Sequence, residues 1–213
     1  MHESAHRFHR EEVASTITHA AGLVASVVGA VVMMSLAMRS ELPWRVPAVL
    51  VYCGTLVLVY LSSTLYHAAR HPGARTILQV VDHCAVYLLI AGTYTPLCLL
   101  GLGGVQGWVI CLFVWMLAIA GIILKLFHGG GRMMFLSTAT YLAMGWVGVF
   151  AAQPFLDALS PRAVAYVVAG GLAYTAGTAF FASQRIPYAH AWWHVFVLIG
   201  SWCHFVAIAS QVV

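Results

Sequence analysis

Long apolar stretches alternate with short polar breaks along this chain, and each stretch is about as long as a bilayer is thick. A helix needs roughly 20 apolar residues to cross about 30 Å of hydrocarbon. Counting such stretches between the polar breaks gives seven predicted transmembrane helices, with the limits 13–37, 47–69, 77–100, 107–127, 134–153, 161–182 and 189–212. We therefore expect an all-α membrane protein, a seven-helix bundle that occupies residues 1–213 as a single domain.

Proline and glycine mark the breaks between these stretches. His71-Pro72-Gly73 follows the second stretch, a run of three glycines separates the fourth from the fifth, and Ser160-Pro161 precedes the sixth. Another proline lies inside the third stretch, in Thr93-Tyr94-Thr95-Pro96. Because proline removes a backbone donor, we expect a kink in the outer half of that helix.

The composition agrees with a membrane protein and disfavours other classes. Hydrophobic residues make up 62% of the 213 residues and charged residues only 8%, a balance unusual for a water-soluble domain. The first apolar stretch is too long for the core of a signal peptide, so we expect an uncleaved first span preceded by a short cytoplasmic segment, residues 1–12. The net charge of +4 forms no basic stripe, so nucleic acid is not an expected partner.

The distribution of positive charge predicts the orientation. Positively charged short loops stay in the cytoplasm. The N-terminal side of the predicted membrane carries Arg7, Arg10, Arg70, Arg75, Lys125, Arg132 and Arg185, and the other side carries Arg39, Arg45 and Arg162. This asymmetry predicts a cytoplasmic N-terminus and an outside C-terminus, in a multi-pass protein of the cell membrane.

A few ionisable side chains interrupt the apolar stretches. They are His19, His67, Asp82, His83, His190, His194 and His204. Such residues are costly in a bilayer and usually face the interior of the bundle. The predicted topology places His67, Asp82 and His190 within one or two turns of the cytoplasmic surface. Three separate helices would therefore deliver polar side chains to one level of the membrane.

The spacing of two of these histidines suggests a metal site. His190 and His194 are one turn apart on one helix face, so both imidazoles could bind one ion. A third imidazole from His67 would give a three-nitrogen set with an open fourth position, which is typical of catalytic zinc. Ser63, four residues before His67, and Asp82 could then serve the bound water as hydroxyl partner and proton acceptor. The alternative is that these histidines are ordinary hydrogen-bonded bundle residues.

The remaining candidates receive smaller roles. His204 lies about 21 Å along the helix from His190, so we expect it to be a packing or pathway residue. His19 is expected to support the site or to form an interhelical hydrogen bond. His83 is expected to point away from the side of the helix that carries Asp82.

Five cysteines fall inside the apolar stretches without C-x-x-C spacing, and we expect free thiols. A thiolate site using Cys84 or Cys203 is the alternative.

These residues also carry a family resemblance. The sequence resembles the bacterial hemolysin III proteins, within the progestin and adipoQ receptor superfamily. The resemblance covers essentially the whole chain and is carried by EEVASTITHAAG at Glu11–Gly22, SSTLYH at Ser62–His67, VDHCAVYLLIAGTYTP at Val81–Pro96 and HAWWHVFVLIGSWCHF at His190–Phe205.

The resemblance implies a seven-helix bundle with an intracellular N-terminus. It also implies zinc bound by His67, His190 and His194, with Ser63 and Asp82 as supporting polar residues. The similarity of these relatives to membrane ceramidases implies a hydrolase of lipid amide bonds. The long N-terminal region of the eukaryotic receptors is lacking here, so adaptor binding and hormone recognition are not expected.

Three functions remain open from the sequence. The first is a zinc-dependent hydrolase in membrane lipid homeostasis, acting on a lipid whose acyl chain enters from the bilayer. The second is a non-enzymatic sensor or regulator of membrane lipids with a structural zinc. The third is a cytolysin, against which stand spans that look permanently embedded and the lack of an export signal.

Overall fold

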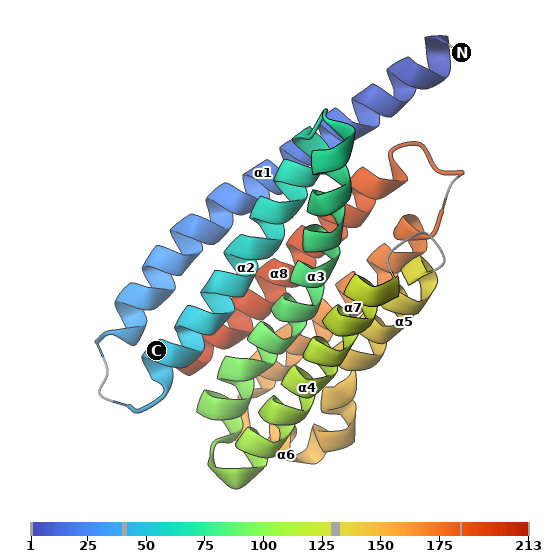
Figure 1. The fold of residues 1–213 in the computed structure, drawn as a ribbon. Coiled ribbons are helices and arrows are strands. Elements are labelled where there is room, and N and C mark those ends of the chain that lie inside the picture. Colours follow the sequence, from blue (N-terminus) through green and yellow to red (C-terminus); the bar gives the residue numbers. More distant parts are fainter. Residues whose placement is uncertain (1, 40–41, 129–132, 184, 213) are drawn as a thin grey trace.

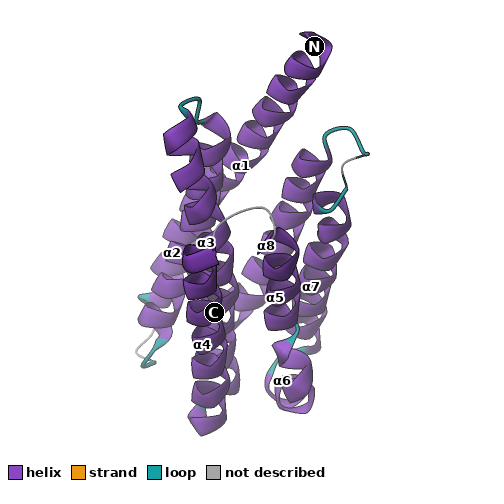
Figure 2. Cartoon of the chain, turned by 45° about the vertical axis from the view of Figure 1, so that its right-hand side comes forward, coloured by secondary structure: helices purple, strands orange, loops and turns teal. Residues whose placement is uncertain are grey.

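A computed structural model describes residues 2–39, 42–128, 133–183 and 185–212 (Figure 1). Its regular structure is helical throughout these ranges (Figure 2). The elements are α1 His2–Ala37, α2 Arg45–Ala68, α3 Pro72–Pro96, the π-helix η1 Leu97–Leu102, α4 Gly104–His128, α5 Met133–Gly145, the 3-10 helix η2 Val147–Ala151, α6 Ala152–Ala158, α7 Pro161–Phe181 and α8 Ala189–Val212. Within the described residues they form seven spans long and apolar enough to cross a membrane, which confirms the predicted number.

The helices form a ring in which neighbours in the sequence are also neighbours in space. Each of α1 to α4 packs on the next, α5 connects α4 to α7, α7 packs on α8, and α8 returns to α1. Large apolar side chains remain exposed on the outside of the bundle, for example Val24, Val28 and Val31 on α1. Such a surface would be an aggregation liability in water and suits contact with lipid.

Helix α1 approaches its neighbours closely through a small residue. A Cβ atom at Gly22 would lie 2.5 Å from the ring of Tyr60 on α2 and 2.8 Å from Leu198 on α8. Glycine is therefore what allows the three backbones to approach each other here. At its N-terminal end, α1 extends beyond the rest of the bundle, so the predicted N-terminal segment continues the first helix (Figure 1).

The third span is longer than predicted, and its irregular part lies at its end. Helix α3 begins at Pro72, a favourable first position for proline, and stays helical through Pro96. The backbone then changes to the π-helix η1, which extends to Leu102. Because Pro96 has no N–H, it cannot make the usual α-helical bond to the carbonyl one turn before it, and the changed pitch follows directly.

The fifth span is interrupted, which the hydrophobic pattern did not reveal. It consists of α5, η2 and α6 and ends at Ala158, five residues beyond the predicted limit of 153. The Tyr94 hydroxyl of α3 donates to the carbonyl of Gly145 at 2.9 Å and accepts from the N–H of Gly148 at 2.8 Å. A side chain from another helix thus replaces backbone bonds at the break, which only the tertiary structure can provide.

Candidate metal centre

Three histidines converge near the end of the bundle where α2 ends and α8 begins. His67 lies in the last turn of α2, and His190 and His194 lie in the first two turns of α8. The Nε2 atoms of His67 and His190 are 3.1 Å apart. One ligand atom from each of the three residues lies within 4.8 Å of the others, so the group could hold a metal ion.

In two of these rings, the Nδ1 nitrogen already makes a hydrogen bond. His67 Nδ1 is 2.9 Å from Glu12 Oε2, and His194 Nδ1 is 3.2 Å from the carbonyl oxygen of Ser15. An ionised carboxylate and a carbonyl can only accept hydrogen bonds, so both Nδ1 atoms donate. In the neutral rings, Nε2 of His67 and Nε2 of His194 therefore keep their lone pairs for a metal.

The donor set and its spacing fit a tetrahedral ion such as zinc. Zn–N bonds of about 2.0–2.1 Å place two imidazole nitrogens about 3.3 Å apart, close to the 3.1 Å between His67 and His190. Two lone pairs at that distance repel each other unless a cation or a proton lies between them. Both His67 and His194 are buried, so neither ring is hydrated from bulk water.

Ser63 and Asp82 lie beside this group on the wall of a cavity. They line it together with His190 and His194. The Ser63 hydroxyl is buried and has no well-formed hydrogen bond within the described residues, although the Asp82 carboxyl is close enough to interact with it. The arrangement provides an acceptor and a hydroxyl for a water or a substrate at the polar end of the cavity.

Two further histidines, His19 and His83, lie close to this group. The ring of His19 stacks on that of His194 with centroids 3.5 Å apart, and neither of its nitrogens makes a hydrogen bond to a described residue. Of the two roles predicted for His19, the interhelical hydrogen bond is therefore wrong, and the supporting role is the one that fits its stacking on a candidate ligand. His83 lines the same cavity as Asp82, so its different direction on the helix does not take it out of the cavity. Positions about 100° apart on a helix can both face a wide cavity.

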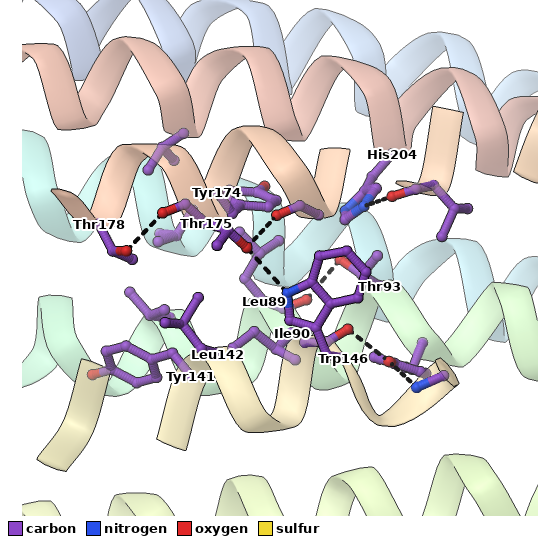
Figure 3. Close-up of a pocket in the computed structure, with 18 of the residues that line it drawn as sticks. Leu89, Ile90, Thr93, Tyr141, Leu142, Trp146, Tyr174, Thr175, Thr178 and His204 are labelled. Atoms are coloured by element: carbon purple, nitrogen blue, oxygen red, sulfur yellow. Dashed lines mark hydrogen bonds between the residues drawn. The ribbon is translucent and has the colours of Figure 1, made fainter. Parts of the chain in front are cut away.

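The cavity has a volume of about 300 Å³ and extends from the histidines into the middle of the bundle. Figure 3 shows part of it, where Trp146 donates to Thr175 at 3.0 Å and His204 donates to the carbonyl of Val167 at 3.1 Å. His204 thus lines the cavity at a distance from the metal group, as its sequence position requires. Apolar side chains make up most of the remaining wall, including Val86, Leu89, Ile90, Leu97, Leu142, Leu159, Val164 and Val197.

All five cysteines are free thiols, as predicted. None belongs to the metal-capable group found among the described residues, so the thiolate alternative has no support.

Apart from His19, sequence reasoning missed the residues that α1 contributes to the site. Glu12 contacts His67, the Ser15 carbonyl contacts His194, and Thr18 Oγ1 lies 3.2 Å from His194 Nδ1. A signal was present in the sequence, because Glu12, Ser15 and His19 recur at helical spacing where the first apolar stretch begins. The pattern indicates a polar stripe but does not name the helix that it meets.

This chain is similar to known proteins over nearly its whole length. The family model described as "Haemolysin-III related" matches residues 7–205. The chain is 40% identical to a hemolysin-3 homolog of Bacillus subtilis over 192 residues, which cover 90% of each chain. It is also 40% identical to hemolysin-3 of Bacillus cereus over 195 residues, covering 92% of this chain and 89% of that protein.

A more distant similarity extends to animals. The chain is 31% identical to the human monocyte to macrophage differentiation factor over 213 residues, covering 93% of this chain and 83% of the human protein. The match of the family model and the near-complete coverage of the bacterial relatives together show that this seven-span protein belongs to the Haemolysin-III related family.

Proposed function

We propose that this protein is a zinc-dependent hydrolase of lipid amide bonds that acts in membrane lipid homeostasis. The observation that supports it is the convergence of three imidazoles, two of which, those of His190 and His194, line the polar end of a mainly apolar cavity. A metal site that only stabilises structure needs no such cavity, whereas a hydrolase needs space for its substrate next to the ion.

Each polar residue has a role in this proposal. His67, His190 and His194 hold the ion, and a zinc ion there would supply a Lewis acid that polarises a carbonyl and activates a water. Asp82 accepts the proton that the water loses and returns it to the leaving amine. The Ser63 hydroxyl, which lacks a well-formed partner, donates to the substrate or orients the water.

The cavity suits an acyl chain that comes from the bilayer. Val149, Leu156 and Val168 line it and are still 57%, 54% and 43% exposed. The cavity therefore reaches the lipid-facing surface between the fifth span and α7. With the predicted cytoplasmic N-terminus, the polar end would lie just beneath the inner leaflet of the cell membrane, and membrane lipids would be the partners.

A direct test measures lipid hydrolysis by the purified protein in vesicles that contain an N-acyl sphingoid lipid. We expect fatty acid release that stops after chelation, returns with zinc, and is absent in His194→Ala. The matched control is Asp157→Asn, which removes an exposed carboxylate on α6 that accepts a hydrogen bond from the Gln153 amide. Release by the His194→Ala protein at the wild-type rate would rule out the mechanism.

The second candidate is a non-enzymatic regulator of membrane lipid state in which the metal ties helices together. It is favoured by the position of the ligands, which join the end of α2 to the start of α8 while Glu12 and Arg75 join α1 and α3 to them. This function predicts a metal-dependent stability without turnover of any amide lipid. Fatty acid release that depends on His194 would exclude it.

A further inference from the structure

We propose that Glu12 is a positioning residue of the metal centre, which orients His67 and fixes its tautomer. The inference rests on the metal site of the proposed function but not on its hydrolytic activity. Glu12 comes from α1, a helix that provides none of the three candidate ligands. With Glu12 in this role, the first span would be a necessary part of the site.

The two oxygens of this carboxylate have different partners. Oε2 is 2.9 Å from His67 Nδ1, and Oε1 is 2.7 Å from Nη2 of Arg75 on α3. The Arg75 guanidinium also lies over the ring of Tyr66, 4.7 Å from its centroid. The carboxylate is thus held from one side by a cation that is itself fixed, and its free rotation is restricted.

Glu12 contacts the nitrogen of His67 that is opposite the one facing the candidate metal position. Nε2 of His67 faces His190, so Nδ1 is the outward nitrogen, and Glu12 meets that atom. A carboxylate at this place keeps the proton on Nδ1, holds the ring plane and strengthens Nε2 as a donor. A contact that only joined α1 to α2 would have no reason to select this atom.

Charge supports the same assignment. His67 is almost fully buried, with 3% of its side chain exposed, and the Glu12 side chain is 18% exposed. A divalent cation held by three neutral imidazoles brings two positive charges into an apolar bundle. The Glu12 carboxylate offsets part of this charge from behind a ligand, and Arg75 keeps that carboxylate in place when no metal is bound.

The experiment measures zinc affinity on the full-length protein in nanodiscs, by competition with a chromogenic chelator after the metal has been removed. Loss of a carboxylate behind a histidine ligand typically weakens metal binding about 10- to 100-fold, and we expect this for Glu12→Ala. Glu12→Gln keeps an acceptor oxygen without the charge, so its loss should be smaller. Asp157→Asn is the matched control and should bind zinc as the wild type does.

A spectroscopic readout and the apo-protein stability distinguish positioning from simple helix clamping. Cobalt in place of zinc should give visible bands that change in Glu12→Ala and Glu12→Gln. Clamping predicts instead that Glu12→Ala and Arg75→Gln lower the Tm of the metal-free protein equally and leave affinity and spectrum unchanged.

The outcomes separate this proposal from the proposed function. Wild-type affinity and spectrum in both Glu12 variants would overturn the positioning role, and so would a wild-type protein that binds no metal. If wild type binds zinc and hydrolyses no lipid, while the Glu12 variants bind zinc more weakly, the hydrolase is excluded and the positioning role stands.

Discussion

The two sides of the cavity are built differently. In α2 and α3, 50% and 61% of an apolar 18-residue stretch of each span is buried, compared with 11% for the fifth span and 11% for α7 on the opposite side. The first side carries His67, Ser63 and Asp82 and is joined to α1 by charged contacts. The second side presents apolar side chains to the cavity and to lipid.

This difference corresponds to two physical requirements. A metal site needs ligands held by packed surroundings, because a loose donor set loses affinity. A lipid chain needs an apolar space that it can enter from the bilayer, for which a thin wall is sufficient. The comparison therefore predicts that changes on the first side alter metal binding and stability, whereas changes on the second side alter the choice of substrate.

The largest expected effect is that of removing the metal. A ligand present at 100 times its Kd stabilises the native state by about 2.7 kcal/mol, and zinc in such excess should do so here. The measurement is the unfolding of nanodisc-reconstituted protein with and without a chelator. His67→Ala should show no zinc-dependent shift, and an equal shift in that variant would place the ion elsewhere.

The next effect concerns the close approach of α1. Gly22→Ala places a methyl group against Tyr60 and Leu198, and overpacking of this kind costs about 1–3 kcal/mol. Because α1 carries Glu12, zinc affinity should fall together with stability. Gly54→Ala is the matched control, since a Cβ there would meet nothing within 4 Å. Equal behaviour of the two variants would show that α1 does not need this contact.

The smallest effect is expected on the second side, formed by the fifth span and α7. Leu142→Trp fills part of the cavity shown in Figure 3 and should lower kcat/KM for long-chain N-acyl lipids about tenfold, since one or two lost methylene contacts are worth about 1–3 kcal/mol. Zinc affinity and turnover of short-chain lipids should stay unchanged. Leu172→Trp, on the exposed surface of α7, serves as the control. A loss of zinc binding in Leu142→Trp would contradict the division between the two sides.

Much of this architecture was predictable from periodicity and depth. The number of spans follows from hydropathy. The contact between the rings of His190 and His194 follows from their one-turn spacing on the helix. His67 could be matched to them because the second span ends where the seventh begins. The orientation in the membrane remains a prediction based on charge.

The remaining features depend on contacts between distant parts of the chain. Glu12 meets His67 only because α1 lies against α2, 55 residues away in sequence. The break after Gly145 is stabilised by Tyr94, which belongs to another span. No local pattern in either partner specifies the other, so such pairs emerge from packing alone.

Metal content is the most direct test of the central claim. Elemental analysis of detergent-purified wild type and of the His190→Ala/His194→Ala variant would show whether the three imidazoles hold an ion. We expect about one zinc per wild-type chain and almost none in the double variant. A stoichiometric metal retained by the double variant, or a wild-type chain that takes up no metal when zinc is supplied, would contradict the central claim.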